Sequence, residues 1–225
     1  MNTFRAILRG VGQTLITLGL VTLLFCAYEL WITNIYTSRE QSALGSQLQR
    51  EWDQGQDPSV LKAGVTEVPI GKGIAVIRIP ALGKGYAKVV VEGVRHADLK
   101  KGPGHYPGTA LFGQLGNVVI SGHRTTYGAP FNRLDEVHVG DAVVLETRTE
   151  WFTYTVRKSS VVSPHAFEVT YPVPGVKDAV PTQRLLTLTT CNPKYSARTR
   201  LIVLAELTNT RAKKDGPPPA LTGTA

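Results

Sequence analysis

Cysteine is scarce in this chain of 225 residues, which contains only Cys26 and Cys191. Cys26 lies within a long apolar run, and Cys191 lies in the more polar, strand-rich remainder, so the two are not expected to form a disulfide. A single thiol in the remainder also excludes a thiolate-rich zinc site. This scarcity therefore excludes a disulfide scaffold and leaves Cys191 as a free thiol that can do chemistry.

Metal-binding and nucleic-acid-binding signatures are also missing. Basic residues exceed acidic ones by 25 − 17 = 8, and this surplus suits an anionic cell wall or a membrane surface. Because no RNA- or DNA-binding motif accompanies it, nucleic acid is not an expected partner. No zinc-ligand spacing is present either, so we predict neither a metal nor another cofactor. The chain has five histidines: His96, His105, His123, His138 and His165.

Residues 10–32 form an apolar run that is long enough to cross a bilayer, which takes about 20 residues. Arg5 and Arg9 precede the run, so the positive-inside rule places the N-terminus in the cytoplasm. A cleaved signal peptide is less favoured, because the run is longer than the usual apolar region of about 7–15 residues. We predict a single-pass plasma-membrane protein with its anchor in residues 1–36 and the rest of the chain outside. An interfacial aromatic belt is expected at Tyr28, Trp31 and Tyr36.

The rest of the chain divides into three predicted parts. Residues 37–73 are interpreted as a helical stalk and linker, because apolar residues recur every four positions from Leu44 to Trp52. Residues 74–209 form a globular domain. Residues 210–225 are rich in proline, lysine and small residues, so we predict a disordered tail.

The globular domain is predicted to be almost entirely β-structure. Short runs of β-branched or alternating residues are separated by glycine and proline, which favours a closed barrel or a sandwich. Two short helices are expected, at 95–101 and 131–137. The predicted strands are 74–80, 86–93, 118–122, 142–147, 152–162, 184–190 and 200–207.

Cys191 stands at the end of the predicted strand 184–190. Asn192-Pro193 ends that strand, because proline donates no ladder hydrogen bond and restricts the residue before it. The next strand begins at Arg200. A thiol at a strand end is exposed to substrate, and a nearby arginine favours negative charge on sulfur or on a developing oxyanion. The alternative is a small buried cysteine without chemistry.

His123 follows its strand in the same way. It comes directly after Gly122, which lets the backbone bend at the strand end. An imidazole placed there can act as a general acid or base near neutral pH. The other four histidines are predicted to be surface residues.

Two segments resemble the sortases, which are cysteine transpeptidases of Gram-positive cell surfaces. One is residues 187–191, Thr-Leu-Thr-Thr-Cys, with an arginine on the following strand. The other is residues 117–131, which contain Ser-Gly-His-Arg-Thr-Thr-Tyr-Gly. Residues 191–200 are most similar to the class E sortases of high-GC Gram-positive bacteria. The resemblance covers roughly residues 70–207 and implies a closed eight-stranded β-barrel.

The resemblance also implies catalytic roles. Cys191 is the expected nucleophile, His123 the general acid and base, and Arg200 the cation that stabilises the oxyanion. Arg198 competes with Arg200 for the third role, because side chains two residues apart share a face of a strand. The spacing from cysteine to arginine favours Arg200.

Substrate contacts are expected around these residues. Thr189 and Thr190 are candidates to hydrogen-bond near the acyl oxygen, although both are also ordinary strand residues. Tyr86 resembles the class E tyrosine that is linked to a preference for Leu-Ala-x-Thr-Gly over Leu-Pro-x-Thr-Gly. The proline-rich loop 163–183 is the expected wall of the binding groove.

By resemblance, the enzyme cleaves the sorting signal of a surface protein between Thr and Gly. It holds the acyl group as a thioester and transfers it to an amine of the cell-wall precursor lipid II or of a pilin. Two alternatives remain open at this stage. One is another cell-wall cysteine transpeptidase or hydrolase, and the other is a non-catalytic, membrane-tethered β-domain that binds anionic wall polymer.

Overall fold

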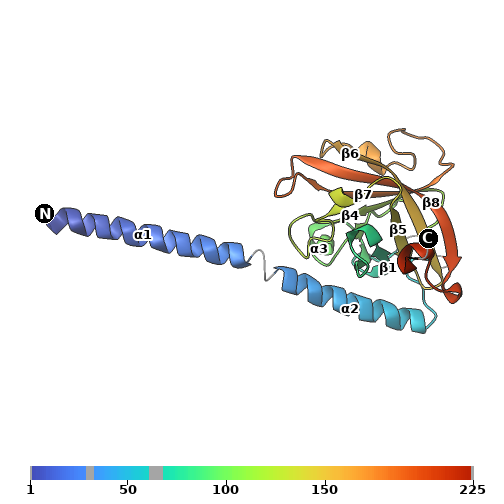
Figure 1. Ribbon diagram of the computed structural model, residues 1–225, viewed down its shortest axis with the longest axis horizontal. Helices are drawn as coiled ribbons and strands as arrows, with labels where there is room; N and C mark the ends of the chain where they lie inside the picture. The colour runs from blue at the N-terminus through green and yellow to red at the C-terminus, as the bar shows by residue number, and fades with distance from the viewer. Residues whose placement is uncertain (1, 29–32, 61–67, 224–225) are drawn as a thin grey trace.

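A computed structural model of the chain describes residues 2–28, 33–60 and 68–223. Figure 1 shows one long helix at the N-terminus, a second helix lying along a barrel, and the barrel itself. The two long helices are α1 (Asn2–Ala27) and α2 (Thr33–Asp53).

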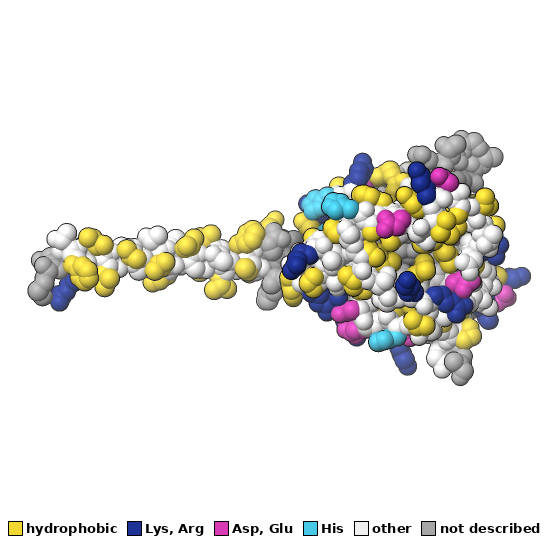
Figure 2. All heavy atoms as spheres, turned by 90° about the horizontal axis from the view of Figure 1, so that it is seen from above, with side chains coloured by type: hydrophobic (Ala, Val, Ile, Leu, Met, Phe, Trp, Pro, Cys, Tyr) yellow, Lys and Arg dark blue, Asp and Glu magenta, His cyan; other side chains and the backbone are white. Residues whose placement is uncertain are grey.

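Helix α1 projects away from the barrel and packs against none of it (Figure 1). Its stretch Thr3–Ala27 is the one candidate membrane span within the described residues. Figure 2 shows hydrophobic side chains along its whole length, with a basic side chain near the start. An apolar N-terminal helix is therefore present as predicted, although it begins before residue 10. Trp31 of the predicted aromatic belt lies outside the described residues.

Helix α2 lies against the barrel instead of separating the barrel from the membrane. Leu44 and Leu48 are buried against strand β2 (Ala87–Glu92). The Gln41 side-chain amide donates a hydrogen bond to the Val89 carbonyl at 3.0 Å and accepts one from the Val89 amide at 2.8 Å. The predicted helix is present, but its interpretation as a stalk was wrong. The apolar stripe exists because it is buried on the domain itself.

The β-strands form one closed barrel in the order β1-β2-β3-β4-β7-β8-β6-β5. Pairing of β1 with β5 closes it, which decides between the predicted barrel and a sandwich. The β2–β3 and β4–β7 pairs are parallel, and the other pairs are antiparallel. The strands are β1 (Gly73–Arg78), β2 (Ala87–Glu92), β3 (Gly104–His105), β4 (Gly116–Ser121), β5 (Ala142–Glu146), β6 (Glu150–Val162), β7 (Arg184–Asn192) and β8 (Thr199–Ala212).

The barrel is filled by alternate apolar side chains of its strands, including the fully buried Ile77, Ile120 and Leu188. The predicted helices at 95–101 and 131–137 are a single helical turn and a 3-10 turn. The short helices are η2 (Pro80–Leu82), α3 (His96–Leu99), η3 (Leu134–Glu136), η4 (Phe167–Thr170), η5 (Lys213–Asp215) and α4 (Pro219–Thr222).

The C-terminal segment is ordered, so the prediction of a disordered tail was wrong for residues 210–223. Strand β8 continues to Ala212 and pairs with the first residues of β6. The Lys213 ammonium contacts the Glu146 carboxylate and lies 4.2 Å from the centre of a Trp151 ring. Composition alone does not reveal this strand pairing, which fixes the tail to the barrel.

His105 is buried, with 1% of its side chain exposed, so its prediction as a surface residue was wrong. Its Nδ1 lies 2.7 Å from Glu92 Oε2, and its Nε2 lies 3.0 Å from the Ala110 carbonyl oxygen. It belongs to β3, whose two residues are too few to show a period in the sequence.

Candidate active site

The site is built where two parallel strands, β4 and β7, end side by side. Each β4 residue pairs with the β7 residue 68 positions later, as in Ser121 with Thr189, 189 − 121 = 68. His123 and Cys191 are separated by the same number, 191 − 123 = 68. Neighbouring strands lie about 4.8 Å apart, so the chain that continues past β4 brings His123 beside Cys191.

Hydrogen bonds extend the strand pairing to that point. The Gly122 amide donates to the Thr189 carbonyl at 3.1 Å, and the Thr190 hydroxyl donates to the Gly122 carbonyl at 2.7 Å. Gly122 is required by close packing, because a Cβ there would lie 2.6 Å from the Phe131 ring. Gly122, which precedes His123, is therefore bound to the two residues that precede Cys191.

Arg200 lies on the other side of the cysteine. In the antiparallel β7–β8 pair, Cys191 is directly opposite Arg200. The Arg200 guanidinium donates hydrogen bonds to the carbonyls of Ala197 and Thr199 at 3.0 and 3.1 Å. Cys191 thus stands on the middle one of three adjacent strands, between the histidine strand and the arginine strand. Its thiol is free and its side chain is half-buried.

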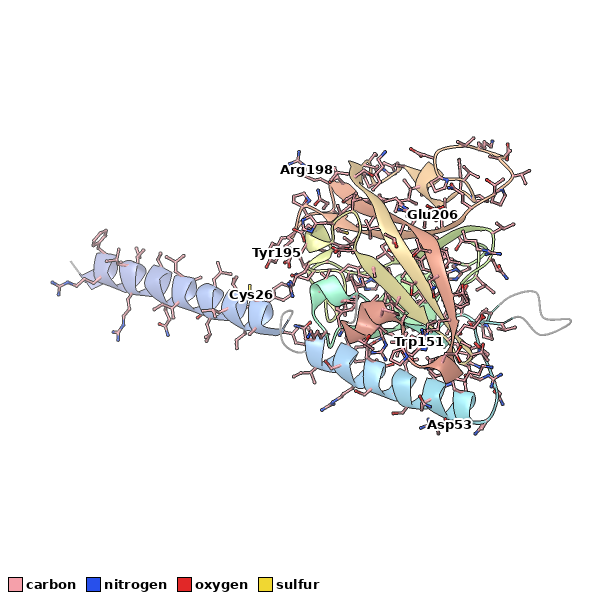
Figure 3. The ribbon with its side chains drawn as sticks, turned by 45° about the vertical axis from the view of Figure 1, so that its right-hand side comes forward. Cys26, Asp53, Trp151, Tyr195, Arg198 and Glu206 are labelled. Atoms are coloured by element: carbon pink, nitrogen blue, oxygen red, sulfur yellow. The ribbon has the colours of Figure 1, made fainter. Side chains whose placement is uncertain are left out.

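Arg198, the competitor of Arg200, is exposed and precedes β8. Figure 3 shows Arg198 and Tyr195 at the end of the barrel that carries the connection from β7 to β8. Arg200 is therefore the arginine that the strand register pairs with Cys191, and Arg198 belongs to the surrounding rim.

Arg124 is a site residue that the sequence analysis did not single out. It is buried, with 4% of its side chain exposed, and its guanidinium lies 2.9 Å from the Asp135 carboxylate. It also donates to the Cys191 carbonyl at 3.3 Å and to the Asn192 side-chain oxygen at 3.0 Å. Arg124 is thus a positioning residue that ties the segment after His123 to the cysteine strand. Its position next to His123 in the sequence was the one feature that could have indicated a place in the site.

The His123 ring is packed among other rings. Its centre lies 5.1 Å from the Tyr127 ring and 6.3 Å from the His96 ring. Its Nε2 is buried and has no hydrogen-bond partner within the described residues. Burial lowers the pKa of His123, and the positive charges of His96 and Lys100 lower it further. At neutral pH this favours the neutral imidazole, which can accept the thiol proton.

Replacing Lys100 with glutamine is expected to raise the pKa of His123. The substitution removes a positive charge that disfavours the imidazolium form, so half-protonation of the ring moves to higher pH. An NMR titration of the histidine ring signals measures this directly. Lys101→Gln is the matched control, because the neighbouring lysine does not contribute to the shift. An unchanged or lower His123 pKa in Lys100→Gln would contradict this electrostatic account.

Three residues predicted to contact substrate, Tyr86, Thr189 and Thr190, are engaged within the protein itself. The Tyr86 hydroxyl donates to the Pro130 carbonyl at 2.7 Å, and burial raises the pKa of Tyr86 above its usual value. Tyr86 therefore supports the loop that follows His123. Thr189 and Thr190 are buried, and the Thr190 hydroxyl is already engaged by Gly122.

The loop 163–183 runs from the active-site end of β6 to the far end of β7. Asn117 fixes it to the barrel by donating to the carbonyls of Val169 and Tyr171 at 3.0 and 3.1 Å. Phe167 remains 66% exposed in it. Within the described residues, no group of three or more His, Cys, Asp or Glu side chains could hold a metal ion.

A closed barrel of this topology, with a half-buried cysteine between a histidine strand and an arginine strand, defines a class of enzyme. The family model of the sortase domain matches residues 77–208, which is more than half of the chain. The chain therefore belongs to the sortase family, whose members are cysteine transpeptidases.

Its similarities within the family point to class E. Sortase SrtE1 of Streptomyces coelicolor is 32% identical over 221 residues, which are 95% of this chain and 60% of that protein. Sortase SrtE2 of the same organism is 31% identical over 213 residues, 92% of this chain and 83% of that protein. The chain thus spans less than two thirds of the length of SrtE1.

Solved structures agree with this class. Sortase E of Streptomyces avermitilis superimposes with a TM-score of 0.63 at 44% identity, covering 68% of this chain and 99% of that chain. Sortase E1 of S. coelicolor, solved with a tripeptide in its active site, has a TM-score of 0.62 at 33% identity and covers 67% and 97%. The predicted fold and the class E resemblance are confirmed.

Proposed function

We propose that this chain is a membrane-anchored class E sortase that transfers a surface protein to an amine. It cleaves a Leu-Ala-x-Thr-Gly or Leu-Pro-x-Thr-Gly signal between Thr and Gly. The observation that supports this proposal is the strand register, which pairs Cys191 with Arg200 and pairs Ser121 with Thr189, two residues before His123 and Cys191. The proposed localisation is the plasma membrane, with the cytoplasmic N-terminus before α1 and the barrel outside.

In the proposed mechanism, His123 takes the proton of the Cys191 thiol, and the thiolate attacks the Thr carbonyl carbon. Arg200 stabilises the negative charge that develops on the carbonyl oxygen. The Thr–Gly C–N bond breaks as His123 returns its proton to the departing Gly amine, which leaves a thioester. An entering amine then loses a proton to His123, attacks the thioester, and releases the thiolate.

The substrate assignment rests on similarity and on one placement. Tyr86 donates a hydrogen bond to Pro130 in the segment that follows His123, so a change at Tyr86 reaches the site through that segment. The proposed donors are surface proteins with the signal, and the proposed acceptors are lipid II or a pilin amine. Direct contact of Thr189, Thr190 or Arg198 with substrate is a further part of the proposal.

A peptide assay tests the reaction. The full chain in detergent is incubated with a Leu-Ala-x-Thr-Gly peptide and triglycine, and mass spectrometry follows the product. We expect an adduct in which triglycine is joined to the Thr carboxyl. A free Thr carboxylate as the only product would indicate a hydrolase instead. Failure to cleave either the Ala-type or the Pro-type peptide would contradict the assignment and favour a binding domain.

A further inference from the structure

The first turn of α2 lies at the active-site end of the barrel. The Gly128 amide donates a hydrogen bond to the Asn34 side-chain oxygen at 2.9 Å. The Thr37 hydroxyl donates to the Lys100 carbonyl at 2.9 Å. Gly128 follows Tyr127, whose ring packs on His123. The start of α2 is therefore fixed to the loop that covers the catalytic histidine.

The last turn of α2 lies at the opposite end. Glu51 forms an ion pair of 3.2 Å with Lys72, which precedes β1, and Trp52 lies 5.2 Å from the ammonium of Lys213, which follows β8. Strand β1 runs in the same direction as β7 and β8 runs opposite to it, so β1 begins and β8 ends away from Cys191. Figure 3 shows Asp53 far from the end that carries Tyr195 and Arg198.

The direction of α2 along the barrel determines which end of the domain faces the membrane. This step rests on the proposed function, in which α1 is the membrane anchor. From Ala27, the last residue of α1, to Thr33, the first of α2, there are 33 − 27 = 6 residue steps. Fully extended, these steps reach about 20 Å. A free-standing helix of 21 residues would lift the domain by roughly 30 Å. Because α2 runs back along the barrel, it does not increase the distance between the domain and the membrane.

We infer that α2 clamps the domain with its active-site end facing the outer surface of the bilayer. The residues exposed at this end suit that partner, because aromatic, apolar and basic side chains favour the interface of a membrane with anionic lipids. Tyr195, in the β7–β8 connection, is 85% exposed. Figure 2 shows basic side chains on the domain beside α1. The exposed residues of this surface are Ile35, Tyr36, Arg39, Tyr195 and Arg198, and the half-buried Lys194 adjoins them.

The acidic residues of this end do not cancel its charge. Asp135 is paired with the buried Arg124, and Glu136 is paired with Arg133. Asp141 lies 4.0 Å from His138, while Glu40 follows Arg39 on α2. The basic side chains of Arg39 and Arg198 are exposed. A bilayer that carries anionic lipids is therefore the complementary partner, and an acceptor amine on a lipid would be presented directly to the Cys191 end.

Energy transfer in lipid nanodiscs tests this orientation. The full chain is reconstituted with anionic lipid and with an acceptor dye on lipid headgroups. A donor dye is placed on Cys191 in a Cys26→Ser chain, or on residue 53 in a Cys26→Ser, Cys191→Ala, Asp53→Cys chain. Asp53 is exposed and lies at the far end of α2. We expect clearly more efficient transfer from position 191 than from position 53.

Equal transfer from both positions would show a freely tumbling domain, and greater transfer from position 53 would show the reverse orientation. Either result overturns the inference. The peptide assay in detergent uses the unlabelled parent chain and does not depend on this orientation, so cleavage by the parent chain together with equal transfer in the labelled chains refutes the clamp alone. The expected transfer in the labelled chains, together with no cleavage by the unlabelled parent chain, refutes the proposed function alone.

Discussion

Cys191→Ala is expected to lower the rate of Thr–Gly cleavage by about 10³-fold or more, because it removes the only group in the site that can form the thioester. The side chain is half-buried at a strand end, so losing one sulfur atom leaves the fold intact. The rate of triglycine adduct formation measures the effect. Mass spectrometry should also show a covalent acyl-enzyme in the parent chain and none in the variant.

Cys26→Ala is the matched control, because Cys26 is the other free cysteine and lies in α1, away from the barrel. We expect this variant to keep the activity of the parent chain. If Cys191→Ala retained more than a tenth of the parent rate, a different nucleophile would have to be sought. Circular dichroism of both variants distinguishes loss of chemistry from loss of folding.

The pairing of Cys191 with Arg200 could be predicted from the local sequence. Two strands joined by a short turn pair antiparallel, so a cysteine near the end of one and an arginine near the start of the next must meet. The pairing that directs His123 toward Cys191 is different, because it joins two parallel strands over 68 residues. No periodicity fixes such a register, and only the resemblance indicated it.

The wrong predictions for α2, for the C-terminal tail and for His105 share one physical cause. In each case the residues pack against or pair with residues that are distant in the sequence. The stripe on α2 predicts an apolar face, but not that strand β2 covers it. The residues of the tail show low complexity, but not the pairing that extends β8. His105 lies in a polar loop by its neighbours in sequence, yet Glu92 provides its buried partner. Tertiary contacts decide each case, and local patterns do not encode them.

The role of Arg124 in the active site could not be predicted from local sequence either. Its sequence position beside His123 is compatible with either a substrate contact or a surface charge. In the structure its charge is buried, paired with Asp135, and directed at the Cys191 carbonyl. A buried charge of this kind holds two segments together only while both partners remain, since an unpaired buried charge is costly.

His123→Gln is expected to lower cleavage by roughly 10²- to 10⁴-fold, which is the usual contribution of general acid–base catalysis. Glutamine keeps a polar side chain of similar reach beside Tyr127 but cannot exchange a proton near neutral pH. All three proton transfers of the proposed mechanism are lost: from the Cys191 thiol, to the departing amine and from the entering amine. The measurement is kcat/KM for the signal peptide, together with the rate at which iodoacetamide alkylates Cys191.

His138→Gln is the control, because that histidine is 80% exposed and forms no part of the site. The control should cleave the peptide at the parent rate. A His123→Gln enzyme within tenfold of the parent would contradict the role proposed for His123 as general acid and base. If alkylation of Cys191 slows in parallel with cleavage, His123 also sets the thiolate population. If only cleavage slows, its main task is to protonate the leaving amine.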